Sequence, residues 1–293
     1  MTSSGDSSPL ALIENEGRTI VFKDSTISSD GEKSDLAVTK SEENGIIRFT
    51  NTKGTAQKSK IGTIDGKSSL VLEAQSEIKC SGNPIENNND ECAVLLYQSG
   101  SKFNSGNGFA CTDSTFGILE SSKYYSYASL FFVTNTRASI QLTNCVLSYG
   151  SNTFIKVATT DQWGVKGSNG GDAVVLLTNQ NIEGDFLVDG DSKLHINLVK
   201  SNIKGKINPA NTGQTVTITI DRYSTITITG NSYCLLINNE IQDGSNLING
   251  SYTWTIGKPI IDNYAKGIFG EKLFILGLSL ILDILLFNGI ILN

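Results

Sequence analysis

The sequence contains a single histidine, His195, so a metal site built from several histidines is excluded. His195 is still a candidate general base. Its position in Leu194-His195-Ile196 favours the simpler interpretation, a strand residue that faces outward.

A basic stripe is also missing. Acidic residues outnumber basic residues by 29 to 23, for a net charge of -6. Nucleic-acid binding needs Lys and Arg to neutralise phosphates. The densest basic spot, Lys58-Ser59-Lys60, is interpreted as a solvated turn. We therefore expect no nucleic-acid partner.

No Cys-x-x-Cys pair occurs among the 5 cysteines, which argues against a zinc ribbon. The number is odd, so they cannot all pair within one chain. Cys111 and Cys145 lie inside the recurring unit described below. We expect both to be small buried residues stacked between strands, with a disulfide or a reactive thiol as the alternatives.

Helical signals are absent too, because no stretch before residue 265 combines a helical period with caps. The sequence has only 4 prolines but 29 glycines, and it is rich in Ser, Thr and Asn. This composition is typical of many tight turns between short strands. The sequence therefore predicts an all-β fold.

What the chain does contain is one recurring unit: an alternating apolar run, then a polar residue, often Asn or Asp, a small residue and a branched apolar residue. Copies occur at residues 21–27, 109–116, 141–147, 176–182, 197–203 and 220–226. The last three end at Ile182, Ile203 and Ile226, which gives steps of 21 and 23 residues. A strand unit that returns at this spacing predicts a solenoid.

The most economical solenoid is a parallel β-helix of roughly ten coils, with strands stacked about 4.7–4.9 Å apart. Val, Ile, Leu and Phe would form its core, and the recurring Asn or Asp would lie at bends. An antiparallel sandwich is the competing fold. It would use dipeptides such as Asp65-Gly66 and Asp189-Gly190 as hairpin turns.

The two ends of the chain differ from its middle. Residues 1–17 are mostly polar, lack the apolar region of a secretory signal, and are predicted to be a disordered or entry segment. Residues 18–264 would form the β-helix, and residues 265–293 a hydrophobic C-terminal segment. Within it, 273–292 is a possible membrane anchor despite Asp283. A cleaved lipid-anchor tail and a buried helix are the alternatives.

The stretch from Trp163 to Asp172, with Leu177-Thr178-Asn179-Gln180, the run from Glu183 to Asp189, Ser192-Lys193-Leu194 and Leu198, resembles a known family. The chain resembles the right-handed, pectin-lyase-like β-helix adhesin segments of large bacterial surface proteins, over residues 90–260. The resemblance implies a right-handed solenoid in a surface or stalk role, and it transfers no catalytic residue. The segment after Tyr264 and the missing signal depart from this family.

The same fold also carries polysaccharide lyases and hydrolases. The Asn-Thr-Asp, Asp-Asp and Gly-His-Gly pattern of polygalacturonases is absent. A weak candidate for Ca²⁺ is the turn with Asp185, Asp189 and Asp191, which lies close to Lys193. Solvated turn carboxylates are the simpler interpretation, and no cofactor is otherwise expected.

Two loops are candidates for ligand binding. Trp163 borders a Gly-rich segment, and Tyr124, Tyr125 and Tyr127 lie close together in Lys123-Tyr124-Tyr125-Ser126-Tyr127. Aromatic rings with a polar end suit contacts that are partly wet, such as stacking on a sugar. Partial cover of the core is the alternative role for these rings.

We therefore expect a non-catalytic, adhesin-like protein at the cell surface or outside the cell that binds a glycan or a surface protein. A polysaccharide lyase or glycoside hydrolase that uses the carboxylate turn is the alternative. A passive scaffold without a ligand is a third possibility.

Overall fold

The computed structural model describes residues 1–15, 17–83, 91–99, 104–165, 169–236 and 246–257. They belong to one compact unit, Met1–Gly257, and contain strands but no helix. None of the described residues therefore lies in a helix long and apolar enough to cross a membrane. The predicted hydrophobic segment 265–293, with the possible anchor at 273–292, lies outside the described residues.

The largest sheet has 15 strands and divides into two stacks that share β5 (Ala37–Thr50) and β7 (Gly62–Glu73). Both are long strands whose first and second halves pair with different neighbours. The first halves belong to the β9 stack, with β2 (Ala11–Asn15), β9 (Cys92–Tyr97), β12 (Ser129–Thr134), β15 (Thr153–Val157) and β18 (Asp185–Val188). The second halves belong to the β10 stack, with β3 (Thr19–Lys23), β10 (Asn104–Thr112), β13 (Thr136–Thr143), β16 (Asp172–Thr178), β19 (Lys193–Val199), β21 (Thr215–Ile220), β23 (Ser232–Leu236) and β25 (Trp254–Gly257).

Two smaller sheets complete the fold. The β8 stack has six strands: β1 (Thr2–Ser3), β4 (Thr26–Ser29), β6 (Lys53–Ala56), β8 (Glu77–Cys80), β11 (Thr115–Ile118) and β14 (Val146–Ser148). The β20 stack has four strands: β17 (Asn181–Glu183), β20 (Asn202–Gly205), β22 (Thr225–Ile228) and β24 (Leu247–Ile248).

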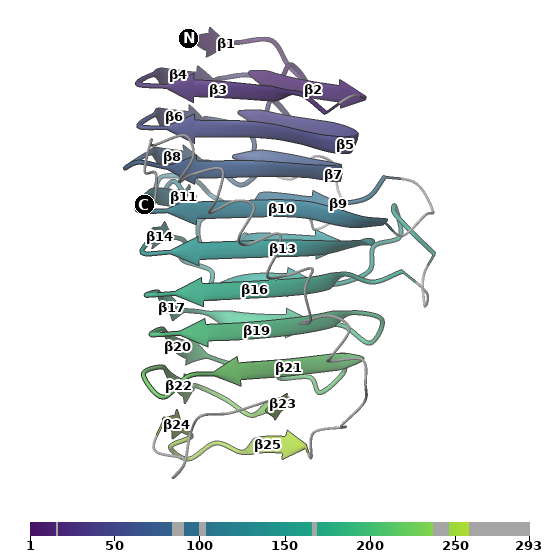
Figure 1. The fold of residues 1–293 in the computed structure, drawn as a ribbon, viewed down its shortest axis with the longest axis vertical. Coiled ribbons are helices and arrows are strands. Elements are labelled where there is room, and N and C mark those ends of the chain that lie inside the picture. Colours follow the sequence, from purple (N-terminus) through teal and green to yellow (C-terminus); the bar gives the residue numbers. More distant parts are fainter. Residues whose placement is uncertain (16, 84–90, 100–103, 166–168, 237–245, 258–293) are drawn as a thin grey trace, which may run out of the picture. The chain divides into compact units, whose positions relative to one another are not determined.

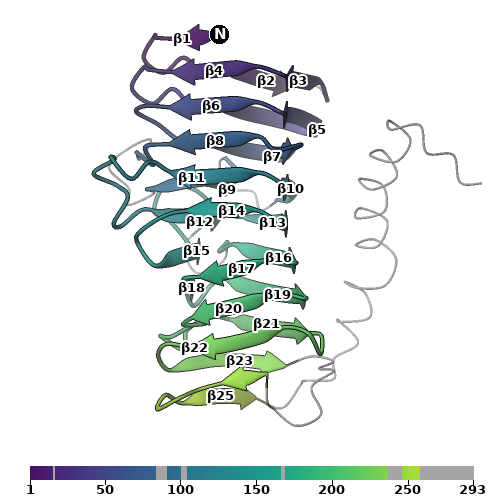
Figure 2. The ribbon, with the colours of Figure 1, turned by 90° about the vertical axis from the view of Figure 1, so that its left-hand side faces the viewer.

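The chain visits the stacks in a constant order. It passes from the β9 stack to the β10 stack and then to the β8 or β20 stack, as in β9–β10–β11 and β18–β19–β20. After β20 the described strands alternate between the β10 and β20 stacks, as in β21–β22 and β23–β24. Each such pass is called a coil below. Figures 1 and 2 show the strands stacked in sequence order. Every ladder between described strands is parallel. The structure is therefore compatible with a β-helix-like solenoid, and it excludes an antiparallel sandwich.

The N-terminal residues take part in these ladders. Although a disordered or entry segment was predicted for 1–17, β1 pairs with β4 and β2 pairs with β5. Leu10 packs against the core, with Ala11 and Ile13 buried in it. Sequence reasoning missed these strands because each is short, and the strand that hydrogen-bonds to it belongs to the next coil.

The recurring polar residue of the repeat lies at the bend after the β10 stack. At six of these bends it adopts a left-handed backbone conformation, with φ near +50°. The six residues are Asp24, Asn51, Asp113, Asn144, Asn179 and Lys200. Asn and Asp tolerate this region better than most residues, which explains why they recur there.

At several bends a small buried residue follows and connects consecutive coils. The Ser114 hydroxyl accepts a hydrogen bond from the backbone N–H of Ser76 at 3.1 Å. The Ser201 hydroxyl accepts one from the N–H of Gln180 at 3.0 Å, and the Ser224 hydroxyl one from the N–H of Ser201 at 2.9 Å. These hydroxyls pair backbone donors that the sheets leave without a partner at the corner.

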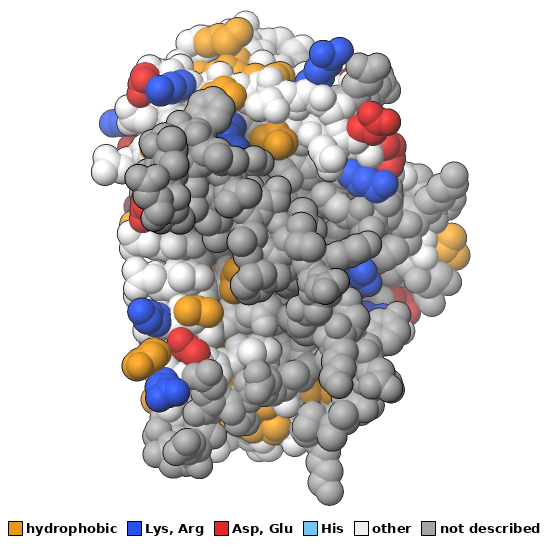
Figure 3. All heavy atoms as spheres, in the orientation of Figure 1, with side chains coloured by type: hydrophobic (Ala, Val, Ile, Leu, Met, Phe, Trp, Pro, Cys, Tyr) orange, Lys and Arg blue, Asp and Glu red, His pale blue; other side chains and the backbone are white. Residues whose placement is uncertain are grey.

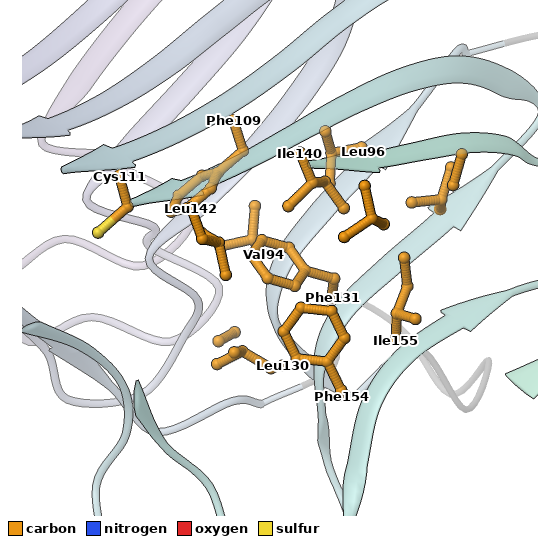
Figure 4. Packing of buried hydrophobic residues seen from close by; sticks show 14 of the residues in the cluster. Val94, Leu96, Phe109, Cys111, Leu130, Phe131, Ile140, Leu142, Phe154 and Ile155 are labelled. Carbon is orange, nitrogen blue, oxygen red and sulfur yellow. The ribbon is translucent and has the colours of Figure 1, made fainter. Parts of the chain in front are cut away.

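Phenylalanines stack through the centre of the core (Figure 4). The ring of Phe131 lies 5.1 Å from that of Phe109, 5.8 Å from Phe116 and 5.6 Å from Phe154, measured between centroids. Phe154 in turn lies 5.0 Å from Phe186. All five rings are buried. Side chains from consecutive coils therefore form one continuous core.

Cys111 and Cys145 form a disulfide that connects two consecutive coils, with Cα atoms 6.5 Å apart. The expectation of two unbonded stacked cysteines was wrong, and the disulfide alternative is what the structure contains. Cys80, Cys92 and Cys234 are buried, and the structure places none of them in a disulfide. Burial raises the pKa of the Cys80 and Cys234 thiols to about 12, so both stay protonated and unreactive.

Candidate functional site

The three predicted tyrosines lie in the connection from β11 to β12, which extends beyond the strand ends (Figure 2). The Tyr124 and Tyr127 rings are 5.4 Å apart between centroids, and the Lys123 ammonium lies 4.8 Å from the centre of the Tyr124 ring. Tyr127 is 54% exposed, whereas Tyr124 and Tyr125 are partly buried against the core. The loop thus offers one open ring beside a cation.

The neighbouring coil supports this loop from the connection between β14 and β15. The Tyr125 carbonyl accepts a hydrogen bond from the Gly150 N–H at 3.0 Å. A Cβ at position 150 would overlap the Tyr125 ring, so only glycine allows this close approach. The Tyr149 hydroxyl donates to the Glu183 carbonyl at 2.7 Å. Burial raises the pKa of Tyr149, which keeps this donor protonated. We call Tyr124, Tyr125, Tyr127 and Tyr149 the tyrosine patch.

The other candidate binding residue, Trp163, lies in a different loop. It follows β15, whereas the tyrosine loop precedes β12, and the two strands are parallel neighbours. The two loops therefore lie at opposite ends of the strands of the β9 stack, one where the strands begin and the other where they end. Trp163 is only 9% exposed, and its ring lies 4.4 Å from that of Tyr97 in a second small apolar cluster.

The carboxylates of the candidate calcium turn have other partners. Asp185 lies 2.9 Å from the Lys206 ammonium and also accepts a hydrogen bond from the Lys206 N–H. Asp189 accepts hydrogen bonds from the N–H and hydroxyl of Thr159 and from the N–H of Asp191. Within the described part of the chain, no group of three or more His, Cys, Asp or Glu residues is placed to hold a metal ion.

His195 belongs to a polar cluster on the outer side of the β10 stack. Its Nδ1 lies 2.7 Å from the Thr217 hydroxyl, and its Nε2 lies 3.7 Å from Asp172 Oδ1. The other oxygen of Asp172 accepts a hydrogen bond from Arg137 Nε at 2.9 Å and lies 2.9 Å from Arg137 Nη2 in an ion pair. The His195 side chain is 12% exposed and Thr217 is buried, so a substrate has little access to them.

Burial lowers the pKa of His195, and the cations Lys193 and Arg137 act in the same direction, while Asp172 opposes them. The unfolded chain therefore binds a proton at His195 before the folded chain does. By linkage, the free energy of unfolding then rises with pH across this window.

We expect stability to decrease as pH falls below about 6.5, the ordinary histidine value, because protonation then favours the unfolded chain. A His195→Gln variant should lose this part of the pH dependence. As His195 is the only histidine, its ring proton signal in NMR is unambiguous. A midpoint below 6.5 is expected, and a midpoint above it would mean that Asp172 outweighs burial.

Charges of both signs are interspersed where described side chains are visible in Figure 3. Ion pairs join neighbouring coils, such as Arg48 with Glu73 at 2.6 Å and Lys204 with Glu183 at 3.5 Å. This surface offers mixed charge rather than a field of one sign.

Sequence reasoning missed Tyr149 and the contact of Arg137 with Asp172. Tyr149 had a usable signal, because Tyr149-Gly150 follows the repeat ending at Leu147 just as the tyrosine loop follows the previous copy. Arg137 and Asp172 are register partners 35 residues apart in the sequence. This register could not be predicted from the sequence, because the segment between the two strands does not have the length of a regular repeat.

No family model matches the chain, and neither the curated proteins nor the solved structures that were searched contain a match.

Proposed function

We propose that the chain forms a right-handed parallel β-helix of roughly ten coils and serves as a non-catalytic, adhesin-like protein on the cell surface or outside the cell. Its ligand in this proposal is a glycan, bound at the tyrosine patch. The parallel stacks support the solenoid part of the proposal, because each coil adds one strand to a stack and the sheet surface is thereby extended.

The observation that carries the binding proposal is the exposed ring of Tyr127 beside Tyr124 and Lys123. A sugar can lay its C–H face on an aromatic ring while its hydroxyls stay in water, and the Lys123 ammonium adds a hydrogen-bond donor. The loop is also held in place by the hydrogen bond from the Gly150 N–H to the Tyr125 carbonyl and by the packing of Tyr124 and Tyr125 against the core, which lowers the entropy lost on binding.

We expect the purified chain to bind members of a glycan array, and Tyr127→Ala to weaken the best ligand by roughly tenfold or more, as for an aromatic anchor of an interface. Titration calorimetry would measure the change. Tyr223→Ala is the matched control. Tyr223 is 66% exposed and also lies near a cation, Arg222, but no second tyrosine ring stacks on it in the described part of the chain.

Other outcomes separate the alternatives. Binding to a surface protein but to no glycan would replace the proposed ligand class, and no binding at all would leave a passive scaffold. Release of reducing ends or unsaturated products from a polysaccharide, abolished by Asp189→Asn, would establish the polysaccharide-degrading enzyme instead. The existing partners of Asp185 and Asp189 give that enzyme less support.

Attachment to a membrane through 273–292 completes the proposal. The full chain should then float with lipid vesicles, and deletion of these residues should leave it in the soluble fraction.

A further inference from the structure

Asn249, Gly250 and Ser251 form the only Asn-x-Ser/Thr triplet in the sequence. This triplet is the acceptor signal for N-linked glycans in proteins that enter the secretory route. We propose that Asn249 is an N-glycosylation site. The inference rests on the surface or secreted location in the proposed function, because the modifying enzyme meets its acceptor only on that route.

The triplet lies at the tip of the turn between β24 and β25. Asn249, Gly250, Ser251 and Tyr252 are all exposed, and the turn closes with a hydrogen bond from the Tyr252 N–H to the Asn249 carbonyl at 2.9 Å. A Cβ at Gly250 would meet no atom within 4 Å. The turn thus extends into open space, where a large enzyme can reach it.

The reacting groups would be the side-chain amide of Asn249 and the hydroxyl of Ser251. Within the residues that the structure describes, neither Asn249 nor Ser251 makes a side-chain hydrogen bond. Other exposed asparagines do use their amide nitrogen: Asn202 donates to Asn181 at 2.8 Å, and Asn144 donates to Asp113 at 2.7 Å. The Asn249 amide is therefore open to reaction without loss of a contact that holds two coils together.

The chemistry needs a polyprenyl-pyrophosphate-linked oligosaccharide as the donor. The Asn249 Nδ2 attacks the anomeric carbon of the first sugar and loses a proton. A C–N bond forms, the C–O bond to the pyrophosphate breaks, and the lipid pyrophosphate leaves. The disulfide between Cys111 and Cys145 fits the same route, since disulfides persist in oxidising compartments.

The glycan would leave the tyrosine patch free. The coil that contains β11 includes β10, and the coil that contains β24 includes β23. These two strands are five steps apart in the β10 stack. At about 4.8 Å per step the separation is roughly 24 Å. Glycosylation and ligand binding can therefore be tested independently.

The test expresses the full chain behind an added export signal in eukaryotic cells. We expect one glycan per chain, detected as a gel shift that an N-glycan-specific amidase removes. Asn249→Gln and Ser251→Ala should abolish the shift, and Ser251→Thr should keep it. Asn181→Gln, an exposed asparagine outside any such triplet, is the matched control and should also keep it.

Exported wild-type chain with an oxidised Cys111–Cys145 pair and no glycan would overturn the inference. If that sample still binds its glycan ligand, only this inference fails. If the chain is glycosylated but binds no ligand, the proposed function fails and the acceptor site stands.

Discussion

Replacing Phe131 by alanine is expected to lower the free energy of unfolding by about 3–5 kcal/mol, the usual cost of removing a buried aromatic side chain. The Phe131 ring contacts the rings of Phe109, Phe116 and Phe154, so the substitution leaves a cavity between consecutive coils. Denaturant titration followed by circular dichroism measures the loss.

Phe22→Ala is the matched control for Phe131→Ala. Phe22 is only partly buried, and its ring packs on Phe49 at 5.5 Å between centroids. We expect a smaller loss, because less apolar area is removed from contact. Equal losses at the two positions would contradict a core that runs through the centre of the coils.

Removing the disulfide should have an effect of similar size. The bond joins residues 34 apart, and the chain-entropy model for such a loop gives about 3–4 kcal/mol. Cys111→Ala combined with Cys145→Ala should therefore lower the denaturation midpoint markedly. Reduction of the wild-type chain should reproduce most of the loss, because both treatments release the same loop in the unfolded state.

Cys80→Ala controls for the loss of a buried sulfur without loss of a crosslink, since Cys80 is free and buried. Thiol titration of the unfolded chain gives an independent count. The unreduced protein should show three reactive thiols, and the reduced protein all 5. Five thiols before reduction would mean that Cys111 and Cys145 are not bonded.

The repeat predicted the parallel stacks because each copy contains the same two local signals, an alternating apolar strand and a polar residue suited to the bend that follows it. Asp24, Asp113 and Asn144 occupy bends where φ is positive, and the short polar side chain that tolerates this conformation is visible in the sequence. Ile182 and Ile203 are register partners, as their spacing suggested. The strands at residues 1–17 were missed because pairing, and not local pattern, defines them.

The candidate site was less predictable. The grouping of Tyr124 and Tyr127 follows from their closeness in the chain, and the structure bears out that proximity. Trp163 lies apart from the tyrosines because its loop follows a strand of the β9 stack, whereas the tyrosine loop precedes one. The sequence does not show which loop precedes and which follows a strand of the same stack. The contact of His195 with Thr217 likewise needs the register of β19 and β21.

Disulfide trapping tests the central claim, parallel stacking in the stated register, most directly. Asn181 pairs with Asn202 and Glu183 with Lys204 on β17 and β20, and all four are exposed. Two double variants, Asn181→Cys with Asn202→Cys and Glu183→Cys with Lys204→Cys, should crosslink readily on mild oxidation, because neighbouring strands lie within disulfide reach. The crossed combinations, Asn181→Cys with Lys204→Cys and Glu183→Cys with Asn202→Cys, should not, since diagonal partners lie roughly 8 Å apart. Crosslinking of the crossed pairs instead of the direct ones would mean that these strands run antiparallel.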